Sequence, residues 1–178
     1  MEPDDGGLRL AWAPVPPDRA QRREVARDLL RGLLAAEGWP EVAFEQACPH
    51  CGGAHGPLHV TGAPWRASVS YAGGLAVAGV YPATAPGFAI DAEPLVDPTR
   101  DAAGIPGGLL RWVRVEATLK ADSRGLRVDP AVVSVAGRPG GWTATIPGRV
   151  AVVADGWEPT ATPPGILVSA AILSPRRA

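Results

Sequence analysis

Glycine and proline interrupt this chain at short intervals, and their spacing limits the fold more than any other feature. The 178 residues include 22 glycines and 20 prolines. Glycine supplies the positive backbone angles that tight turns need, and proline stiffens turns. The chain is 46% hydrophobic, which is enough to bury a real core. We therefore expect many short elements, arranged as one ordinary domain or as two small lobes.

The charge and hydropathy of the whole chain disfavour two classes of partner. A formal net charge of -1 gives no general attraction to nucleic acid or to anionic lipid, so any polyanion must be met by a local basic patch. No stretch reaches the roughly 20 apolar residues that span a bilayer. The acidic start MEPDDGG does not resemble a secretory signal. We expect a cytoplasmic protein that has neither nucleic acid nor a membrane as its partner.

An amphipathic pattern predicts a long helix near the start. Residues 1–17 are proline-rich, and we expect them to be loose. Asp18 suits the N-cap of a helix that runs to about Glu37, where Gly38 ends it. The apolar stripe of this helix consists of Val25, Ala26, Leu29, Leu30, Leu33 and Leu34. Beside it lies a ridge of Arg19, Arg23, Arg27 and Arg31, whose ordinary interpretation is a solvated face.

Short strands and a second helix make up the rest of the predicted fold. Residues 67–70 and 75–81 resemble two strands joined by YAGG, whose glycines favour a tight turn. A third strand covers 88–93, and LLRWVRVEATLKA predicts a helix at 109–121. Further strand candidates lie at 41–45, 128–136, 141–146, 149–156 and 165–173. This count predicts an α+β fold with an N-terminal lobe at 18–87 and a C-terminal lobe at 88–178.

Three acidic residues are candidates for a divalent-metal site. Asp91 and Glu93 stand two residues apart on a predicted strand, so their side chains leave the same face. Two carboxylates at such short range repel one another unless a cation lies between them. Carboxylate oxygens are suitable ligands for Mg²⁺. Glu116 on the facing helix would supply a third oxygen, and Lys120 would lie one turn later. From spacing alone, Glu116 and Lys120 are also an ordinary surface pair.

Several segments together resemble a known enzyme family. FAIDAE is followed at compatible spacing by WVRVEATLK, with the hairpin SVSYAGG upstream and KADSRGL downstream. These segments resemble the surfactin-type 4′-phosphopantetheinyl transferases, and CPHCGGAHG resembles the connector of short actinobacterial-type members. The resemblance extends from about Arg19 to GILVSAAIL. It implies a pseudo-symmetric fold of two α+β lobes, with coenzyme A in the cleft between them.

The resemblance also implies a reaction and a role for each site residue. The family transfers the 4′-phosphopantetheine arm of coenzyme A to a serine of an acyl or peptidyl carrier protein. It implies that Asp91, Glu93 and Glu116 hold Mg²⁺. Glu116 would accept the serine proton, and Lys120 would assist the leaving group. Within the coenzyme A site, Ser70 and the backbone of Tyr71 would bind the pyrophosphate, and Arg23 the 3′-phosphate.

The sequence departs from the family pattern at three positions. Val115 replaces the lysine that precedes the helix glutamate, Tyr71 replaces a frequent histidine, and HGPL lacks the lysine of HGKP. Each change removes a basic or ionisable group from the phosphate side of the site. An alternative function is therefore a catalytically weakened adaptor that binds carrier domains or coenzyme A.

A cysteine and histidine cluster offers a further alternative. Cys48, Cys51, His55 and His59 supply a complete set of zinc ligands within twelve residues. The spacing is tighter than in zinc fingers, and His50 is a competing ligand. The favoured interpretation is a pair of free or buried thiols. A structural zinc site, and with it a small zinc-dependent interaction module, stays the alternative.

Overall fold

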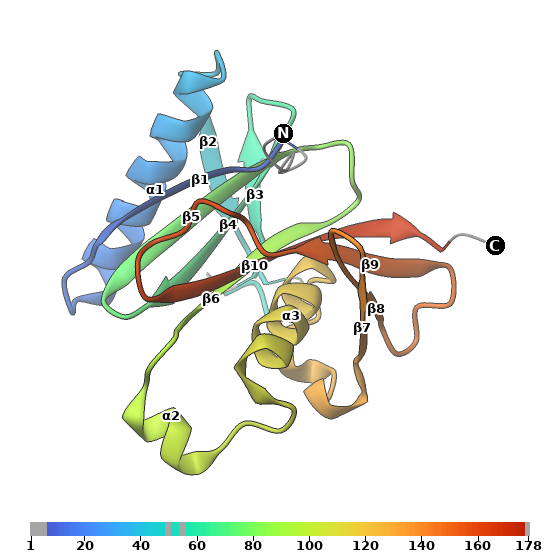
Figure 1. Cartoon of the computed structure of the whole chain (residues 1–178). Coiled ribbons are helices and arrows are strands. Elements are labelled where there is room, and N and C mark those ends of the chain that lie inside the picture. Colours follow the sequence, from blue (N-terminus) through green and yellow to red (C-terminus); the bar gives the residue numbers. More distant parts are fainter. Residues whose placement is uncertain (1–6, 49–50, 54–55, 177–178) are drawn as a thin grey trace. The chain divides into compact units, whose positions relative to one another are not determined.

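The computed structural model describes residues 7–48, 51–53 and 56–176. The chain divides into two compact units, Met1–Thr84 and Ala85–Ala178, and each is treated by itself below. Within the described residues, both units combine α-helix with antiparallel sheet, so the predicted α+β class is confirmed (Figure 1). No helix among the described residues has the length and apolar character needed to cross a membrane.

The first unit is a helix packed against a small sheet. Strands β1 (Arg9–Pro14), β5 (Leu75–Pro82) and β4 (Trp65–Ala72) form a three-stranded antiparallel sheet in that order. Strands β2 (Ala43–Gln46) and β3 (Leu58–Thr61) pair separately. Helix α1 (Arg19–Ala36) buries Leu30 and Leu34 against Ala67, Ala78 and Val80 of the sheet, which closes the core of this unit.

Two local signals of the first unit act as predicted. The Asp18 side chain accepts a hydrogen bond from the backbone N–H of Gln21 at 2.9 Å, which caps α1. Between β4 and β5, Ala72 pairs with Leu75, and the two intervening glycines both have positive φ angles. A two-residue turn of this kind needs positive φ at its centre, which glycine adopts without strain.

Strand β1 corrects the expectation that residues 1–17 are loose. Arg9–Pro14 pairs with β5, and Leu10 lies opposite Gly79. The partner strand is more than 60 residues away in sequence, so no local pattern reports this pairing. Proline is tolerated at the end of β1 because β1 is an edge strand and Pro14 is its last residue.

The second unit is a five-stranded antiparallel sheet covered by a helix. The sheet has the order β6 (Phe88–Pro94), β10 (Ile166–Pro175), β9 (Val152–Trp157), β8 (Gly141–Thr145) and β7 (Ser134–Arg138). Helix α3 (Gly108–Ala121) packs on β6 and β10. A short helix, α2 (Pro98–Ala103), lies between β6 and α3 in the chain, and the sequence patterns did not predict it.

The predicted strand at 128–136 is wrong over its first half. The turns η1 (Gly125–Arg127) and η2 (Pro130–Val132) precede β7, which begins only at Ser134. The Asp129 side chain accepts from the backbone N–H of Ala131 and caps η2. An aspartate followed by a proline favours the start of a helix, with the aspartate as N-cap and the proline as the first helical residue. Asp129 and Pro130 therefore begin a helical turn where the sequence pattern predicted a strand.

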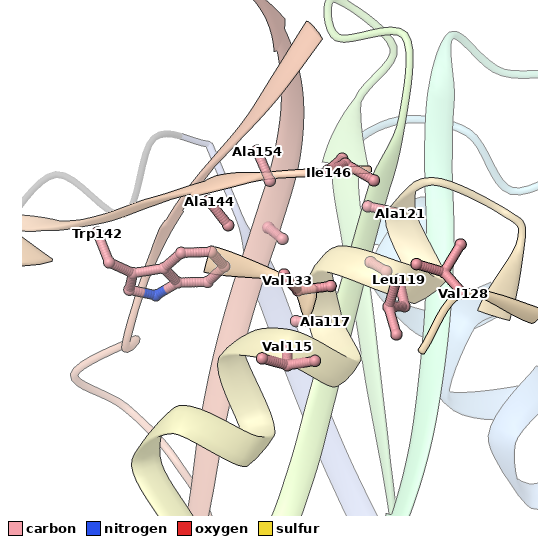
Figure 2. Packing of buried hydrophobic residues seen from close by; sticks show 12 residues of the cluster. Val115, Ala117, Leu119, Ala121, Val128, Val133, Trp142, Ala144, Ile146 and Ala154 are labelled. Carbon is pink, nitrogen blue, oxygen red and sulfur yellow. The ribbon is translucent and has the colours of Figure 1, made fainter. Parts of the chain in front are cut away.

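The core of the second unit lies between α3 and the sheet. Figure 2 shows Trp142 and Ala154 of the sheet on the side of α3 that carries Val115 and Ala117. Trp142 is fully buried. A Cβ at Gly156 would lie 2.1 Å from the Trp142 ring, so the strand beside the indole must carry glycine. Dense packing of this kind fixes the position of α3 on the sheet.

Candidate functional site

Two side-chain contacts join α3 to β6 within the second unit. Trp112 Nε1 donates to Glu93 Oε1 at 3.3 Å. Two helical turns later, Lys120 Nζ donates to Asp91 Oδ1 at 2.6 Å. Glu116 lies between Trp112 and Lys120 on the same face of the helix. The structure therefore brings the four sequence-predicted residues Asp91, Glu93, Glu116 and Lys120 to one contact between a strand and a helix.

Asp91 occupies the most enclosed position of the four. The residue is 4% exposed, whereas the Lys120 side chain is 35% exposed. In the sheet, Asp91 lies opposite Ser169 of β10, which is fully buried. Burial of a carboxylate is costly unless a cation or hydrogen-bond donors compensate it, and the Lys120 ammonium supplies that compensation here.

Glu93 has a cationic neighbour in Arg100, which the sequence patterns missed. The Nη1 atom of Arg100 lies 3.6 Å from Glu93 Oε2 and also donates to the carbonyl of Pro94 at 2.6 Å. Arg100 belongs to α2, which the side chain of Asp97 caps and Pro98 begins. An aspartate before proline is a recognised helix start, so Asp97 and Pro98 were the signal that would have placed Arg100.

Glu116 is a half-buried carboxylate whose pKa lies above its ordinary value. Its Oε1 atom is buried and has no hydrogen-bond partner among the described residues. Burial raises the pKa of Glu116, and the charges of Asp91 and Glu93 raise it further, whereas Lys120 lowers it. Carboxylates affect one another in this way only at short range. The three acidic groups therefore interact as one electrostatic cluster.

The carboxylate oxygens of this cluster are suitable ligands for a hard cation, although they are not arranged as a complete coordination site. Within residues 7–48, 51–53 and 56–176, no three His, Cys, Asp or Glu side chains form a group that could hold a metal ion. Carboxylate oxygens from Asp91, Glu93 and Glu116 are the ligand type that Mg²⁺ prefers, and the buried Glu116 Oε1 has a free acceptor site. The Lys120 ammonium already donates to Asp91 Oδ1, so a cation bound here would either share the Asp91 carboxylate with Lys120 or replace Lys120.

Three of the predicted phosphate-binding residues, Arg23, Ser70 and Tyr71, belong to the first unit, whereas Lys120 belongs to the second. The Tyr71 hydroxyl donates to the backbone carbonyl of Arg22 at 3.4 Å, and the Arg22 guanidinium lies 5.9 Å from the centre of the Tyr71 ring. Burial raises the pKa of Tyr71, while Arg23, Arg22 and Arg27 lower it, so this tyrosine lies among three arginines. The Arg23 charge is thus close enough to affect the Tyr71 hydroxyl.

The side chains of Ser70 and Tyr71 leave opposite faces of β4. Successive residues of a strand point to opposite faces, and Tyr71 lies on the face of β4 that carries α1. The Ser70 side chain therefore leaves the other face, where it is buried. A phosphate bound by the Ser70 hydroxyl would approach from that face, whereas the Tyr71 side chain is held against α1.

Val115 has a structural reason to be apolar. It is fully buried and belongs to the hydrophobic core between α3 and the sheet (Figure 2). A lysine at this position would have to bury its ammonium or reshape the core around Trp142. The departure from the family pattern is therefore coupled to core packing.

The cysteine cluster is described only in part. Cys48 is half-buried, Cys51 is exposed, and His59 lies opposite Glu45 in the β2–β3 ladder. The backbone N–H of Gly52 donates to the carbonyl of Cys48 at 2.8 Å. His55 and His50 lie outside the described residues, so the zinc set of Cys48, Cys51, His55 and His59 stays a prediction.

No protein-family model matches this chain, and no curated protein matches it. The assignment to a reaction class depends on the quoted motifs and on the geometry of the residues they contain.

Proposed function

We propose that this chain is a magnesium-dependent 4′-phosphopantetheinyl transferase that modifies an acyl or peptidyl carrier protein. The observation that carries the proposal is the meeting of Asp91 and Glu93 of β6 with Glu116 and Lys120 of α3. These are the motif residues of the resemblance, and they share one electrostatic cluster. We also propose that the two units correspond to the two lobes of that fold.

The proposed reaction joins the carrier serine to the phosphopantetheine phosphorus of coenzyme A. A bond forms between the serine oxygen and this phosphorus, and the bond to the bridging oxygen breaks, so adenosine 3′,5′-bisphosphate leaves. Asp91, Glu93 and Glu116 would hold the magnesium ion, whose charge offsets that of the pyrophosphate oxygens. Glu116 would accept the serine proton as the general base.

Lys120 and residues of the first unit would bind the phosphates. The Lys120 ammonium, released from Asp91, faces the transferred phosphate and neutralises charge on the leaving oxygen. Arg23 meets the 3′-phosphate, and its position beside Tyr71 supports this role. Ser70 and the backbone of Tyr71 are the proposed hydrogen-bond partners of the pyrophosphate.

A second candidate function is an adaptor that binds coenzyme A or carrier domains without transfer. The observation that favours it is the neutralisation of the acidic cluster by the chain's own cations. Lys120 lies 2.6 Å from Asp91, and Arg100 lies 3.6 Å from Glu93. A site that has already paired two of its three carboxylates has less need of a metal ion.

The test is direct transfer to a carrier protein. The purified chain is incubated with coenzyme A, Mg²⁺ and a panel of apo carrier domains, and the carriers are examined by intact mass. The transferase proposal predicts the addition of one phosphopantetheine to at least one carrier, and no addition in the presence of EDTA. Binding of coenzyme A without any modification across the panel would contradict the transferase and favour the adaptor.

A further inference from the structure

A second ion pair holds the opposite flank of α3. Arg114 donates to Glu158 through two parallel hydrogen bonds, from Nε to Oε1 at 2.9 Å and from Nη2 to Oε2 at 2.8 Å. The side chains are 17% and 27% exposed. A bidentate pair of this kind fixes direction as well as distance, because the guanidinium and the carboxylate must be coplanar. Arg114 precedes Glu116 by two residues, so the two side chains leave α3 on opposite flanks.

Glu158 is itself held by the sheet. The Ser169 hydroxyl of β10 donates to Glu158 Oε1 at 3.0 Å, and Trp142 Nε1 donates to the Ser169 oxygen at 3.2 Å. The Arg114 guanidinium lies 5.9 Å from the centre of the Trp142 ring. Ser169 and Trp142 are both fully buried, so this network has little freedom to rearrange.

The pairing of β10 with β6 connects this network to the acidic cluster. Ser169 is the cross-strand partner of Asp91, and directly opposite residues of an antiparallel pair share one face. Asp91 in turn accepts from Lys120 of α3. The contacts thus form a closed path that leaves α3 at Arg114, passes Glu158, Ser169 and Asp91, and returns to α3 at Lys120.

This closed path sets the rotation of α3 about its own axis. A helix turns by about 100° per residue, so a rotation that moved Glu116 away from the strand would also break the planar contact of Arg114. We propose that Arg114 and Glu158 are positioning residues of the acidic cluster, which keep Glu116 beside Asp91 and Glu93. The inference rests on the proposed function, because it assigns these two residues a role in the affinity of that cluster for a divalent cation.

The test measures cation binding apart from catalysis. Mn²⁺ serves as the probe, and its affinity for the full chain is determined by electron paramagnetic resonance in the absence of coenzyme A. Partners that orient metal ligands typically change affinity about 10- to 100-fold when mutated. We expect Glu158→Gln to weaken Mn²⁺ binding by roughly tenfold or more. Arg114→Lys keeps the charge but loses the planar fork, and we expect a smaller loss in the same direction.

A matched ion pair provides the control. Arg138 and Asp155 also pair in the second unit, at 3.4 Å, and the Asp155 side chain is 29% exposed, close to the value for Glu158. Asp155→Asn should leave Mn²⁺ affinity unchanged, whatever it does to the melting temperature. If Glu158→Gln and Arg114→Lys lower the melting temperature but bind Mn²⁺ as the wild type does, the positioning role is wrong while the proposed function stands. A wild type that binds no Mn²⁺ would contradict both.

Discussion

Lys120 of α3 donates a hydrogen bond to Asp91 of β6 at 2.6 Å, and Asp91 is only 4% exposed. The contact pairs a buried carboxylate with a partly exposed ammonium. In the proposed mechanism, a metal ion on the carboxylates would leave this ammonium available to a phosphate. The stability of the second unit and the proposed chemistry therefore depend on the same side chain.

Lys120→Met tests the stabilising part of this relationship. Asp91 would lose its ammonium partner while remaining buried, so we expect the free energy of unfolding to fall by about 2 kcal/mol. The loss stays below that of a fully buried pair because water screens the partly exposed Lys120 side chain. Urea denaturation measures it, with Lys120→Arg as the control that retains the charge. An unchanged midpoint for Lys120→Met would show that the pair contributes nothing to folding.

The raised pKa of Glu116 predicts a specific pH dependence of stability. Burial is the main cause, followed by the charge of Asp91. Between the ordinary glutamate pKa and the raised one, the folded protein keeps a proton that the unfolded chain has released. The free energy of unfolding therefore falls as pH rises through this window, and the loss is complete above the raised pKa.

Glu116→Gln should remove this component from the pH profile. We expect the variant, compared with the wild type in EDTA, to lose less stability as pH rises through the window and to be at least as stable at neutral pH. Urea titrations at a series of pH values measure the difference, and Glu41→Gln is a control at an exposed glutamate. A Glu116→Gln protein that loses more stability than the wild type as pH rises would show that the sign is wrong.

Val115→Lys tests whether the departure from the family pattern is enforced by packing. Val115 is fully buried against the core that contains Trp142. We expect the lysine to cost roughly 3 kcal/mol or more, because it buries an unpaired charge. Val115→Ala should cost only about 1 to 2 kcal/mol, since it removes two methyl groups without adding a charge. Equal stability of Val115→Lys and the wild type, measured by thermal unfolding, would show that this position accepts the family lysine.

The assignment of Arg23 is tested by comparing two ligands. Arg23 lies beside Tyr71, whereas Arg31 is exposed and pairs with Asp28 at 2.7 Å. We expect Arg23→Ala to weaken coenzyme A binding by about tenfold, or about 1.4 kcal/mol, and to leave dephospho-coenzyme A binding unchanged. Arg31→Ala is the matched control and should affect neither ligand. Equal weakening of both ligands by Arg23→Ala would exclude a contact with the 3′-phosphate.

Local signals in the sequence predicted the elements that depend on nearby residues. The cap at Asp18, the paired glycines 73 and 74, and the alternation that places Asp91 and Glu93 on one face all act within a few residues of chain. The strand and helix that carry the acidic cluster were therefore predictable. Their ion pair through Lys120 and Asp91 was not predicted, because helix spacing placed Lys120 beside Glu116 and the resemblance gave it a phosphate as its partner.

The features that sequence reasoning missed depend on pairing between distant residues. Strand β1 forms because it pairs with β5. Glu158 is held by hydrogen bonds from Arg114 and Ser169, which are 44 and 11 residues away in the sequence. No periodicity links such positions. Arg100 is a different case, because Asp97 and Pro98 before it are a local helix-start signal that is visible in the sequence.

The most direct test of the account is the rate of carrier modification by Glu116→Gln. If Asp91, Glu93 and Glu116 act together in the transition state, the amide should lower the rate by a factor on the order of 10² or more, with folding intact. Asp91→Asn and Glu93→Gln should show losses of the same order, and Asp155→Asn should modify carriers normally. A Glu116→Gln protein that still modifies the carrier at a rate close to that of the wild type would contradict the proposed site.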